Sequence, residues 1–216
     1  MSQALTRGYN VGMRLALRLH SDSDCLAVTR IDVEVARLRA NRLVLSYFVT
    51  GKIGDVRIPP VIAAARTDEL WRHTCFEAFV RILPGAAYYE FNFAPSTQWA
   101  AYRFSGYRTG MRAATEISAP RIDVQSAPEC YALQASLDLD EQASSPSSGG
   151  RSGLASPDVM DLHPGGEAMG GGYPGRRLGL AAVIEETSGR KSYWALAHPP
   201  GKADFHHPDG FAYELS

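Results

Sequence analysis

Apolar and polar side chains alternate with a period of two along several short segments of the chain. Residues 13–20 place a methionine and three leucines on one side and mostly basic residues on the other. This period is typical of a β-strand with one face in the core and one in water. Residues 31–36 alternate in the same way, and residues 43–50 are rich in β-forming side chains. No segment carries a long 3.6-residue period, so the pattern predicts no long helix.

Further candidate strands follow along the chain, separated by turns rich in glycine, proline and serine. About ten short strands with such turns, and no long helix, are typical of an all-β protein. The pattern therefore predicts an antiparallel β-sandwich of roughly ten strands. The further candidates are residues 74–82, 88–94, 99–104, 131–139, 178–186, 192–198 and 211–215.

The composition changes abruptly over residues 140–177. Serine, proline and glycine dominate there, with dense runs at 144–150 and 170–172. Few large apolar residues are present to offset an ordering entropy of about 1–2 kcal/mol per residue. We therefore interpret 140–177 as a flexible low-complexity insertion within a single domain that spans residues 1–216.

The overall composition is that of a soluble globular protein: 216 residues, 45% hydrophobic and 21% charged. Twenty-two basic and 23 acidic residues leave a net charge of −1, so we expect no nucleic-acid partner. The sequence has no apolar run of about 18 residues and no apolar signal-peptide core, which predicts a cytoplasmic protein without a membrane partner. Cys25, Cys75 and Cys130 are too widely spaced to predict a disulfide framework or a zinc knuckle.

The densest pattern lies in a predicted hairpin whose turn contains Pro84 and Gly85. We predict the register in which Ile82 opposes Tyr89, because it separates apolar from polar side chains on the two faces. In this register Arg81 lies directly opposite Glu90. The polar face then combines two carboxylates, an amide and a guanidinium with two aromatic rings, from Glu77, Glu90, Asn92, Arg81, Phe79 and Tyr88.

Such a face has the chemistry of a sugar site. Acids and amides bind hydroxyl pairs in one plane, and a flat ring stacks on the C–H face of a sugar. Trp71 and Trp99 flank the hairpin as candidate platforms, and Arg103 falls on the same side of its strand as Trp99. Two alternatives remain open: an exposed Arg81–Glu90 ion pair of purely structural value, and glycoside hydrolysis by Glu77 and Glu90.

The hairpin and its flanks resemble the bacterial DOMON-like proteins, which are related to the carbohydrate-binding modules of family 9. The resemblance covers much of the chain except the glycine-rich insertion. It is carried by Leu70–Trp71, by the strands 74–79 and 89–96, by Gln98–Trp99 and 102–104, and by the late segments 192–196, Pro199 and 204–209.

The resemblance implies an antiparallel β-sandwich that binds a ligand, either a sugar or haem. Glu77 matches the acid of the motif and Asn92 the amide of the following strand, while Trp71 and Trp99 are candidate platforms. Haem-binding relatives use an axial methionine with a late histidine or lysine, for which Met111 and His198 are the nearest equivalents. These relatives commonly work outside the cytoplasm, whereas this sequence shows no export signal.

Two further sets of residues carry weaker signals. His206, His207 and Asp209 have metal-ligating side chains, although the Asp209–Gly210 pair is more simply interpreted as a turn before the last strand. No motif of a catalytic serine is present, and no cofactor is required by the sequence. We therefore expect a non-catalytic module that binds a small polar ligand such as a carbohydrate. A haem-binding redox module and a structural or partner-binding domain without a small ligand are the alternatives, and the oligomeric state is left open.

Overall fold

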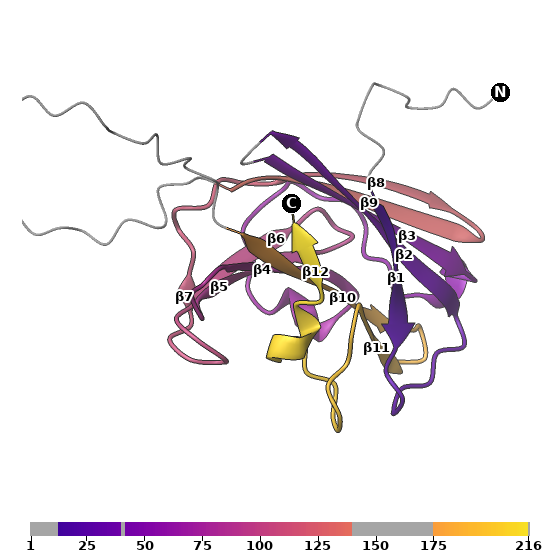
Figure 1. The fold of residues 1–216 in the computed structure, drawn as a ribbon. Coiled ribbons are helices and arrows are strands. Elements are labelled where there is room, and N and C mark those ends of the chain that lie inside the picture. The colour runs from indigo at the N-terminus through magenta and orange to yellow at the C-terminus, as the bar shows by residue number, and fades with distance from the viewer. Residues whose placement is uncertain (1–12, 40–41, 140–174, 216) are drawn as a thin grey trace, which may run out of the picture.

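The structure is a computed structural model that describes residues 13–39, 42–139 and 175–215. In it the strands form two stacked layers, and every pairing between named strands is antiparallel (Figure 1). This confirms the predicted all-β antiparallel sandwich. The only helices in the described residues are single 3-10 turns: η1 (Ile53–Asp55), η2 (Leu70–Arg72) and η4 (Pro208–Gly210).

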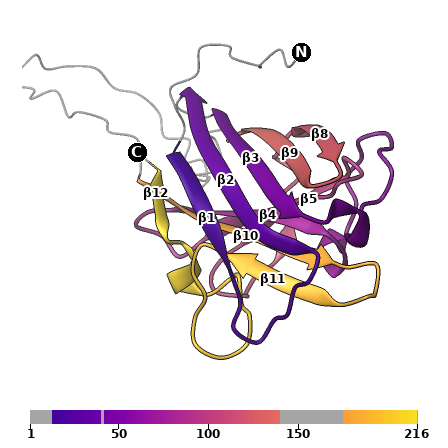
Figure 2. The ribbon, with the colours of Figure 1, turned by 90° about the vertical axis from the view of Figure 1, so that its right-hand side faces the viewer.

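The first layer, here the upper layer, contains five strands in the order β1-β2-β3-β9-β8. Three of them are long and continuous, which gives the layer its extended shape (Figure 2). The strands are β1 (Met13–Leu19), β2 (Val28–Arg39), β3 (Arg42–Gly51), β9 (Cys130–Asp138) and β8 (Arg121–Ala127).

The second, lower layer runs in the order β7-β6-β5-β4-β10-β11, and the short β12 also pairs with β10. β1 joins the layers because it pairs with β2 on one edge and with β11 on the other. The strands are β4 (Cys75–Ile82), β5 (Tyr88–Phe93), β6 (Trp99–Phe104), β7 (Arg112–Ala113), β10 (Arg176–Glu185), β11 (Lys191–Ala195) and β12 (Tyr213–Leu215).

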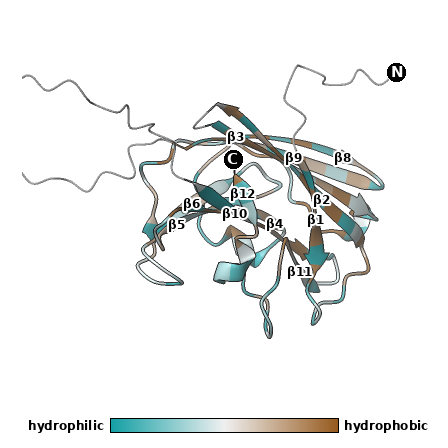
Figure 3. Cartoon of the chain, in the orientation of Figure 1, coloured by the Kyte–Doolittle hydropathy of each residue, from teal (hydrophilic) through white to brown (hydrophobic). Residues whose placement is uncertain are grey.

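The main core fills the space between the two layers. In β2, Ile31, Val33 and Val35 point into it, as the period of two predicts, and the facing aromatic residues come from β4 and β5. Phe76, Phe91 and Phe93 are each fully buried there. Apolar residues accordingly follow the strands, whereas the loops are mostly polar (Figure 3).

A second apolar cluster covers the opposite, outer face of the lower layer. Phe79 and Phe104 lie on this face, and the chain around η2 and η4 packs over them through Leu70 and Phe211. The central strands β4, β5 and β10 are therefore buried on both faces, and nearly every residue in them is buried. This double cover places the polar side chains of the hairpin inside the protein.

The hairpin of β4 and β5 forms as predicted, but its register differs from the predicted one by two residues. Val80, and not Ile82, lies opposite Tyr89. The end of β4 stays with β10, since Leu83 N donates to Gly175 O, and residues 83–87 connect β4 to β5. A shift of two residues preserves the faces, so the hydrophobic pattern could not detect it.

The shift removes the predicted opposition of Arg81 and Glu90. Arg81 lies opposite Tyr88 and its Nε donates to Gly85 O, while Glu90 lies opposite Phe79. The structural ion-pair alternative for this pair is therefore wrong.

The predicted insertion at 140–177 lies outside the described residues, except at its end. There Arg176 and Arg177 already pair with β4 and β12 as the first residues of β10. The insertion therefore ends before residue 176.

Candidate functional site

The polar face predicted for the hairpin exists, but it is not open to solvent. Glu77, Glu90 and Asn92 all point to the outer face of the lower layer, with exposed fractions of 3%, 5% and 0%. The prediction of an exposed recognition surface is wrong here, because chain segments remote in sequence cover these strands. Their predicted role as direct ligand contacts stays a prediction, and it requires residues 204–211 to leave the face.

The C-terminal segment 204–211 forms this cover. It approaches the sheet where β10 carries Gly179, and a Cβ on that residue would lie 3.0 Å from Gly210 O. The imidazole of His206 enters a cage of three rings, with centroid distances of 5.0 Å to Phe104, 5.2 Å to Phe79 and 5.9 Å to Tyr88.

Hydrogen bonds connect the buried polar groups to one another. Asn92 Nδ2 donates to Glu90 Oε1 at 2.7 Å, and Cys75 Sγ donates to Asn92 Oδ1 at 3.6 Å. His206 Nδ1 lies 2.8 Å from Tyr88 Oη, and its Nε2 lies 3.7 Å from Glu90 Oε2. We call these residues, together with Glu77, the closed cluster.

The two carboxyl groups of the closed cluster hold their protons unusually well. Burial raises the pKa of Glu77 well above its ordinary value, and the nearby Glu90 raises it further. Glu77 Oε1 has no hydrogen-bond partner among the described residues. Burial also raises the pKa of Glu90, against the opposing effects of the Asn92 hydrogen bond and of Arg108. Glu77 therefore carries the proton when only one of the two is ionised.

His206 is held neutral by the same surroundings. Burial lowers its pKa to about 4, and the positive charge of Arg108 acts in the same direction. Arg108 and Asp204 form an ion pair at 2.7 Å, which anchors the start of the C-terminal segment to the loop after β6. Burial also raises the pKa of Tyr88 to about 12, so its hydroxyl keeps its proton at neutral pH.

A pocket of about 620 Å³ opens beside this cover, where β4 begins and β5 ends. Leu70 and Ala94 belong both to the outer apolar cluster and to the pocket, so they separate the closed cluster from the open space. We call this space the open pocket; it is lined by Arg57, Pro59, Pro60, Ile62, Thr67, Asp68, Glu69, Leu70, Arg72, His73, Thr74, Ala94, Ser96 and Gln98.

The charges around the open pocket compensate one another in local pairs. Glu185 accepts from His73 Nδ1 at 2.7 Å and lies 3.5 Å from Arg57 Nε. Arg72 pairs with Glu69 at 2.7 Å. Arg57 and Arg72 each use one guanidinium nitrogen in these pairs, and Glu69 uses one carboxylate oxygen. Their other nitrogens and the second oxygen of Glu69 are donors and acceptors at the pocket.

Neutral polar groups complete the lining. Tyr102 Oη donates to Asp68 Oδ1 at 2.8 Å, and Gln98 Nε2 donates to Thr67 Oγ1 at 2.8 Å. The pocket therefore presents donors and acceptors side by side without a strong net charge. A hydroxyl group, which both donates and accepts, matches such a lining better than an ion does.

Two loops of the open pocket hold uncommon backbone conformations. Glu69 has φ 62° and Thr97 has φ 72°, in the left-handed region that non-glycine residues rarely adopt. Thr97 is fixed by its Oγ1, which donates to Ile62 O at 2.8 Å. Residues held in this region cluster at binding sites, where the surrounding structure compensates the cost.

The structure places the predicted ligand contacts Trp71, Trp99 and Arg103 in three different environments. Trp71 is 43% exposed with Arg72 over its ring, but it is not among the residues that line the open pocket. Trp99, in contrast, is 5% exposed in the core between the layers, under the guanidinium of Arg66 at 4.2 Å. Arg103 lies over Tyr89 at 5.6 Å and does not stack on Trp99. Trp71 alone of the predicted platforms offers an open ring.

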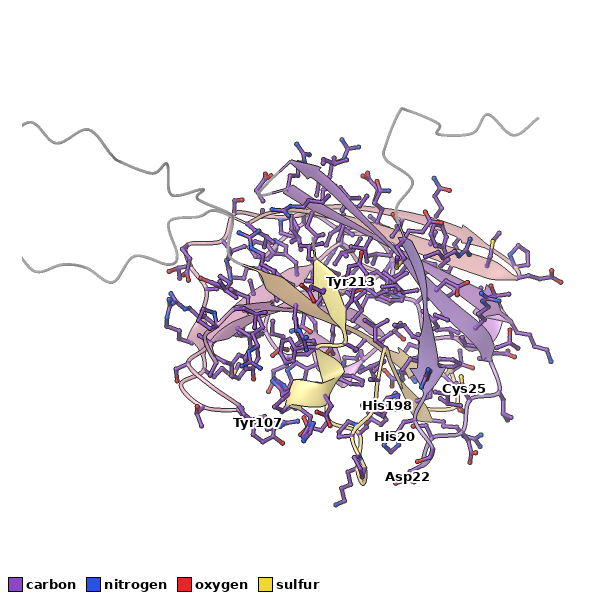
Figure 4. All side chains as sticks on the ribbon, viewed as in Figure 1. His20, Asp22, Cys25, Tyr107, His198 and Tyr213 are labelled. Carbon is purple, nitrogen blue, oxygen red and sulfur yellow. The ribbon has the colours of Figure 1, made fainter. Side chains whose placement is uncertain are left out.

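The haem pair is not brought together. Met111 follows Tyr107 in the loop after β6, whereas His198 lies beside His20 beyond β11, and Figure 4 shows Tyr107 and His198 at separate places below the lower layer. Four strands separate β7 from β11 in the sheet. His198 Nε2 is also bound to Arg18 O at 2.8 Å.

The candidate metal residues diverge as well. His206 points into the closed cluster, while His207 Nδ1 accepts from Asp209 N and begins η4. In the part of the chain that the structure describes, no three metal-ligating side chains converge. The alternative interpretation of a turn before the last strand therefore describes this segment.

Sequence analysis missed most of the residues that line the open pocket. Arg57, Asp68, His73 and Gln98 come from loops and strand ends, where no period marks the orientation of a side chain. The Pro59–Pro60 pair beside Gly54 was the available signal, because it marks a stiff loop.

No protein-family model matches the chain, and no curated protein matches it. Among solved structures the chain is similar to the crystal structure of a candidate carbohydrate-binding protein from Bacteroides uniformis. The two are 13% identical, with a TM-score of 0.59 over 92% of this chain and 83% of that one. At this identity the similarity establishes the fold. No described helix is long and apolar enough to span a bilayer.

Proposed function

We propose that this protein is a non-catalytic carbohydrate-binding module of the DOMON-like type, with its ligand in the open pocket. Residues 1–216 would form one such domain, with the insertion between β9 and β10. The motif resemblance of the hairpin and the fold shared with the Bacteroides uniformis protein support this assignment.

The composition of the open pocket is the observation that carries the proposal. Its volume of about 620 Å³ lies within the range of about 300–1,000 Å³ typical of small-molecule sites. Its donors and acceptors lie side by side. Glu185 pairs with Arg57 and Glu69 with Arg72, while the Tyr102 hydroxyl donates to Asp68. A neutral polyhydroxylated ligand can use both kinds of group at once.

The other functions considered from the sequence have less geometric support. Hydrolysis by Glu77 and Glu90 requires the two carboxyl groups to flank an open cleft, and both lie under residues 204–211. A haem site from Met111 and His198 requires residues that the fold holds four strands apart.

Isothermal titration calorimetry against a panel of neutral mono- and disaccharides tests the proposal. We expect Asp68→Ala and Gln98→Ala to weaken binding by about tenfold or more, because each removes a hydrogen-bonding group from the lining of the open pocket. Asp123→Ala is the matched control, since Asp123 is an exposed carboxylate on β8 in the upper layer.

A decrease in affinity in the two pocket variants, with unchanged affinity in the control, would support the open pocket as the site. Equal affinity in all three variants would place the sugar elsewhere. No binding to any sugar of the panel by the wild-type protein would contradict the proposed function itself.

A further inference from the structure

One wall of the open pocket is made of apolar residues that the protein leaves uncovered. Residues 60–65 are a proline, a valine, an isoleucine and three alanines, and all six are exposed. Val61 is 61% exposed and Ile62 is 49% exposed. Single exposed apolar residues are common on protein surfaces, but a contiguous stretch marks a binding surface.

This stretch is held in place along its length. Ile62 N donates to Ser96 O at 3.1 Å, and Trp99 N donates to Ala65 O at 3.0 Å. Arg57 N donates to Glu185 O at 2.8 Å just before the two prolines, which restrict the backbone further. The apolar wall, residues 59–65, is therefore ordered before any ligand arrives, so binding to it costs little conformational entropy.

The apolar wall and the polar lining belong to one continuous surface. Pro59, Pro60 and Ile62 line the open pocket together with Asp68 and Gln98. Val61 and the alanines at 63–65 are exposed but do not line the pocket, so the apolar surface extends beyond the pocket lining. A ligand that fills the polar part and continues outward would pass directly over this wall.

We infer that the ligand is an amphipathic glycoside, in which a sugar occupies the open pocket and an alkyl or aryl group lies on the apolar wall. This inference rests on the proposed function and specifies the substrate class of the same site. A free sugar would leave Val61 and Ile62 in water, whereas an apolar aglycone would bury them. Continuity with the pocket favours a small ligand over a second copy of the chain, since the wall is only seven residues long.

Titrations with methyl, butyl and hexyl glucosides, galactosides and mannosides, all below micelle-forming concentrations, test the inference. We expect affinity to rise by up to about fourfold for each added methylene that the wall covers, the change that corresponds to burial of about 0.8 kcal/mol. Val61→Ser should flatten this increase while leaving the affinity for the methyl glycoside nearly unchanged, because Val61 does not line the open pocket. Ile62→Ser, which changes a residue of both the wall and the pocket lining, should flatten the increase as well.

Met111→Ser is the matched control, because Met111 is 57% exposed and lies beyond the opposite end of β6. It should keep the full increase with chain length. Sedimentation of the wild-type protein and of Val61→Ser shows whether the wall instead joins two copies of the chain.

The outcomes separate this inference from the proposed function. Equal affinities for methyl, butyl and hexyl glycosides would overturn the inference and leave sugar binding in place. An increase with chain length that persists in both serine variants would overturn it as well, as would a dimer that Val61→Ser dissociates. If neither the glycosides nor the sugar panel bind, the proposed function fails first.

Discussion

The closed cluster and the open pocket lie on the same face of the lower layer, yet they differ in what satisfies their polar groups. In the closed cluster, Asn92 and Glu90 bond to each other, and His206 of the chain itself fills the aromatic cage. In the open pocket, Arg57 and Glu69 are paired on one side only and face solvent on the other. Similar residue types thus serve stability in one region and remain available for a ligand in the other.

The difference shows what an alternating pattern can and cannot establish. Alternation assigned Glu77, Glu90 and Asn92 to one face correctly, since that assignment depends only on the strand geometry of neighbouring residues. Whether that face meets water depends on residues 204–211, more than 110 positions further along the chain.

Removal of the central amide of the closed cluster should have the largest effect. Asn92→Ala leaves Glu90 Oε1 without its donor in a buried site and opens a small cavity, so we expect a loss of about 3 kcal/mol in the free energy of unfolding. Urea denaturation measures it. Gln125→Ala on the exposed β8 is the control and should change stability by less than about 0.5 kcal/mol.

Acid should release the C-terminal cover through His206. Its pKa is about 4 in the folded protein and 6.5 ordinarily, so the unfolded state binds more protons between these values. The contribution of neutral His206 to the free energy of unfolding is complete above pH 6.5. It is lost as the pH falls toward 4, by up to about 3 kcal/mol. Denaturation midpoints between pH 4 and 7 should show this slope in the wild type.

The slope should be much smaller in His206→Gln and unchanged in His207→Gln, which alters the neighbouring imidazole outside the aromatic cage. An equal slope in all three proteins would mean that His206 does not titrate with the cover.

Glu77 should show the opposite dependence at higher pH. Its folded pKa lies well above the ordinary value of 4.5, so the folded state holds a proton that the unfolded state releases. Stability from this group is complete below pH 4.5 and is lost as the pH rises through the folded pKa. Glu77→Gln keeps the shape without the titration, and we expect it to be more stable than the wild type at pH 8.

The difference in stability between the two proteins should shrink as the pH falls toward 4.5, because Glu77 is then protonated in both the folded and the unfolded state. Denaturation curves at both pH values measure the difference. A variant that is less stable at pH 8 would show that the Glu77 carboxylate is stabilised when ionised.

The smallest effect should come from the open pocket. Arg72 and Glu69 are both more than half exposed, so their ion pair contributes little to folding. Arg72→Ala should change the free energy of unfolding by less than about 0.5 kcal/mol in urea denaturation. A loss comparable to that of Asn92→Ala would remove the distinction between the two regions.

The fold could be predicted further than the site. The strand positions, the hairpin and the sorting of its faces follow from local alternation, which the sequence displays directly. The pocket could not be found in this way, because contacts between residues far apart in the chain position its lining. Glu185 pairs with both Arg57 and His73, and Tyr102 donates to Asp68. Trp71 and Trp99 illustrate the same point: both are indoles near one hairpin, and only the packing of the layers separates the exposed ring from the buried one.

The way β1 joins the two layers has a consequence for how the protein opens. Its ladder to β11 contains two residue pairs, Arg18 with Ala195 and Leu19 with Trp194, whereas five pairs hold it to β2. Few backbone hydrogen bonds therefore join β1 to β11, and the isolated bridge between Val56 and Glu186 is a second backbone connection between the layers. Side-chain packing in the core supplies most of the remaining contact between them. Amide hydrogens in the ladder between β1 and β11 should therefore exchange with heavy water sooner than those in the ladder between β1 and β2. The protein would then open first between β1 and β11.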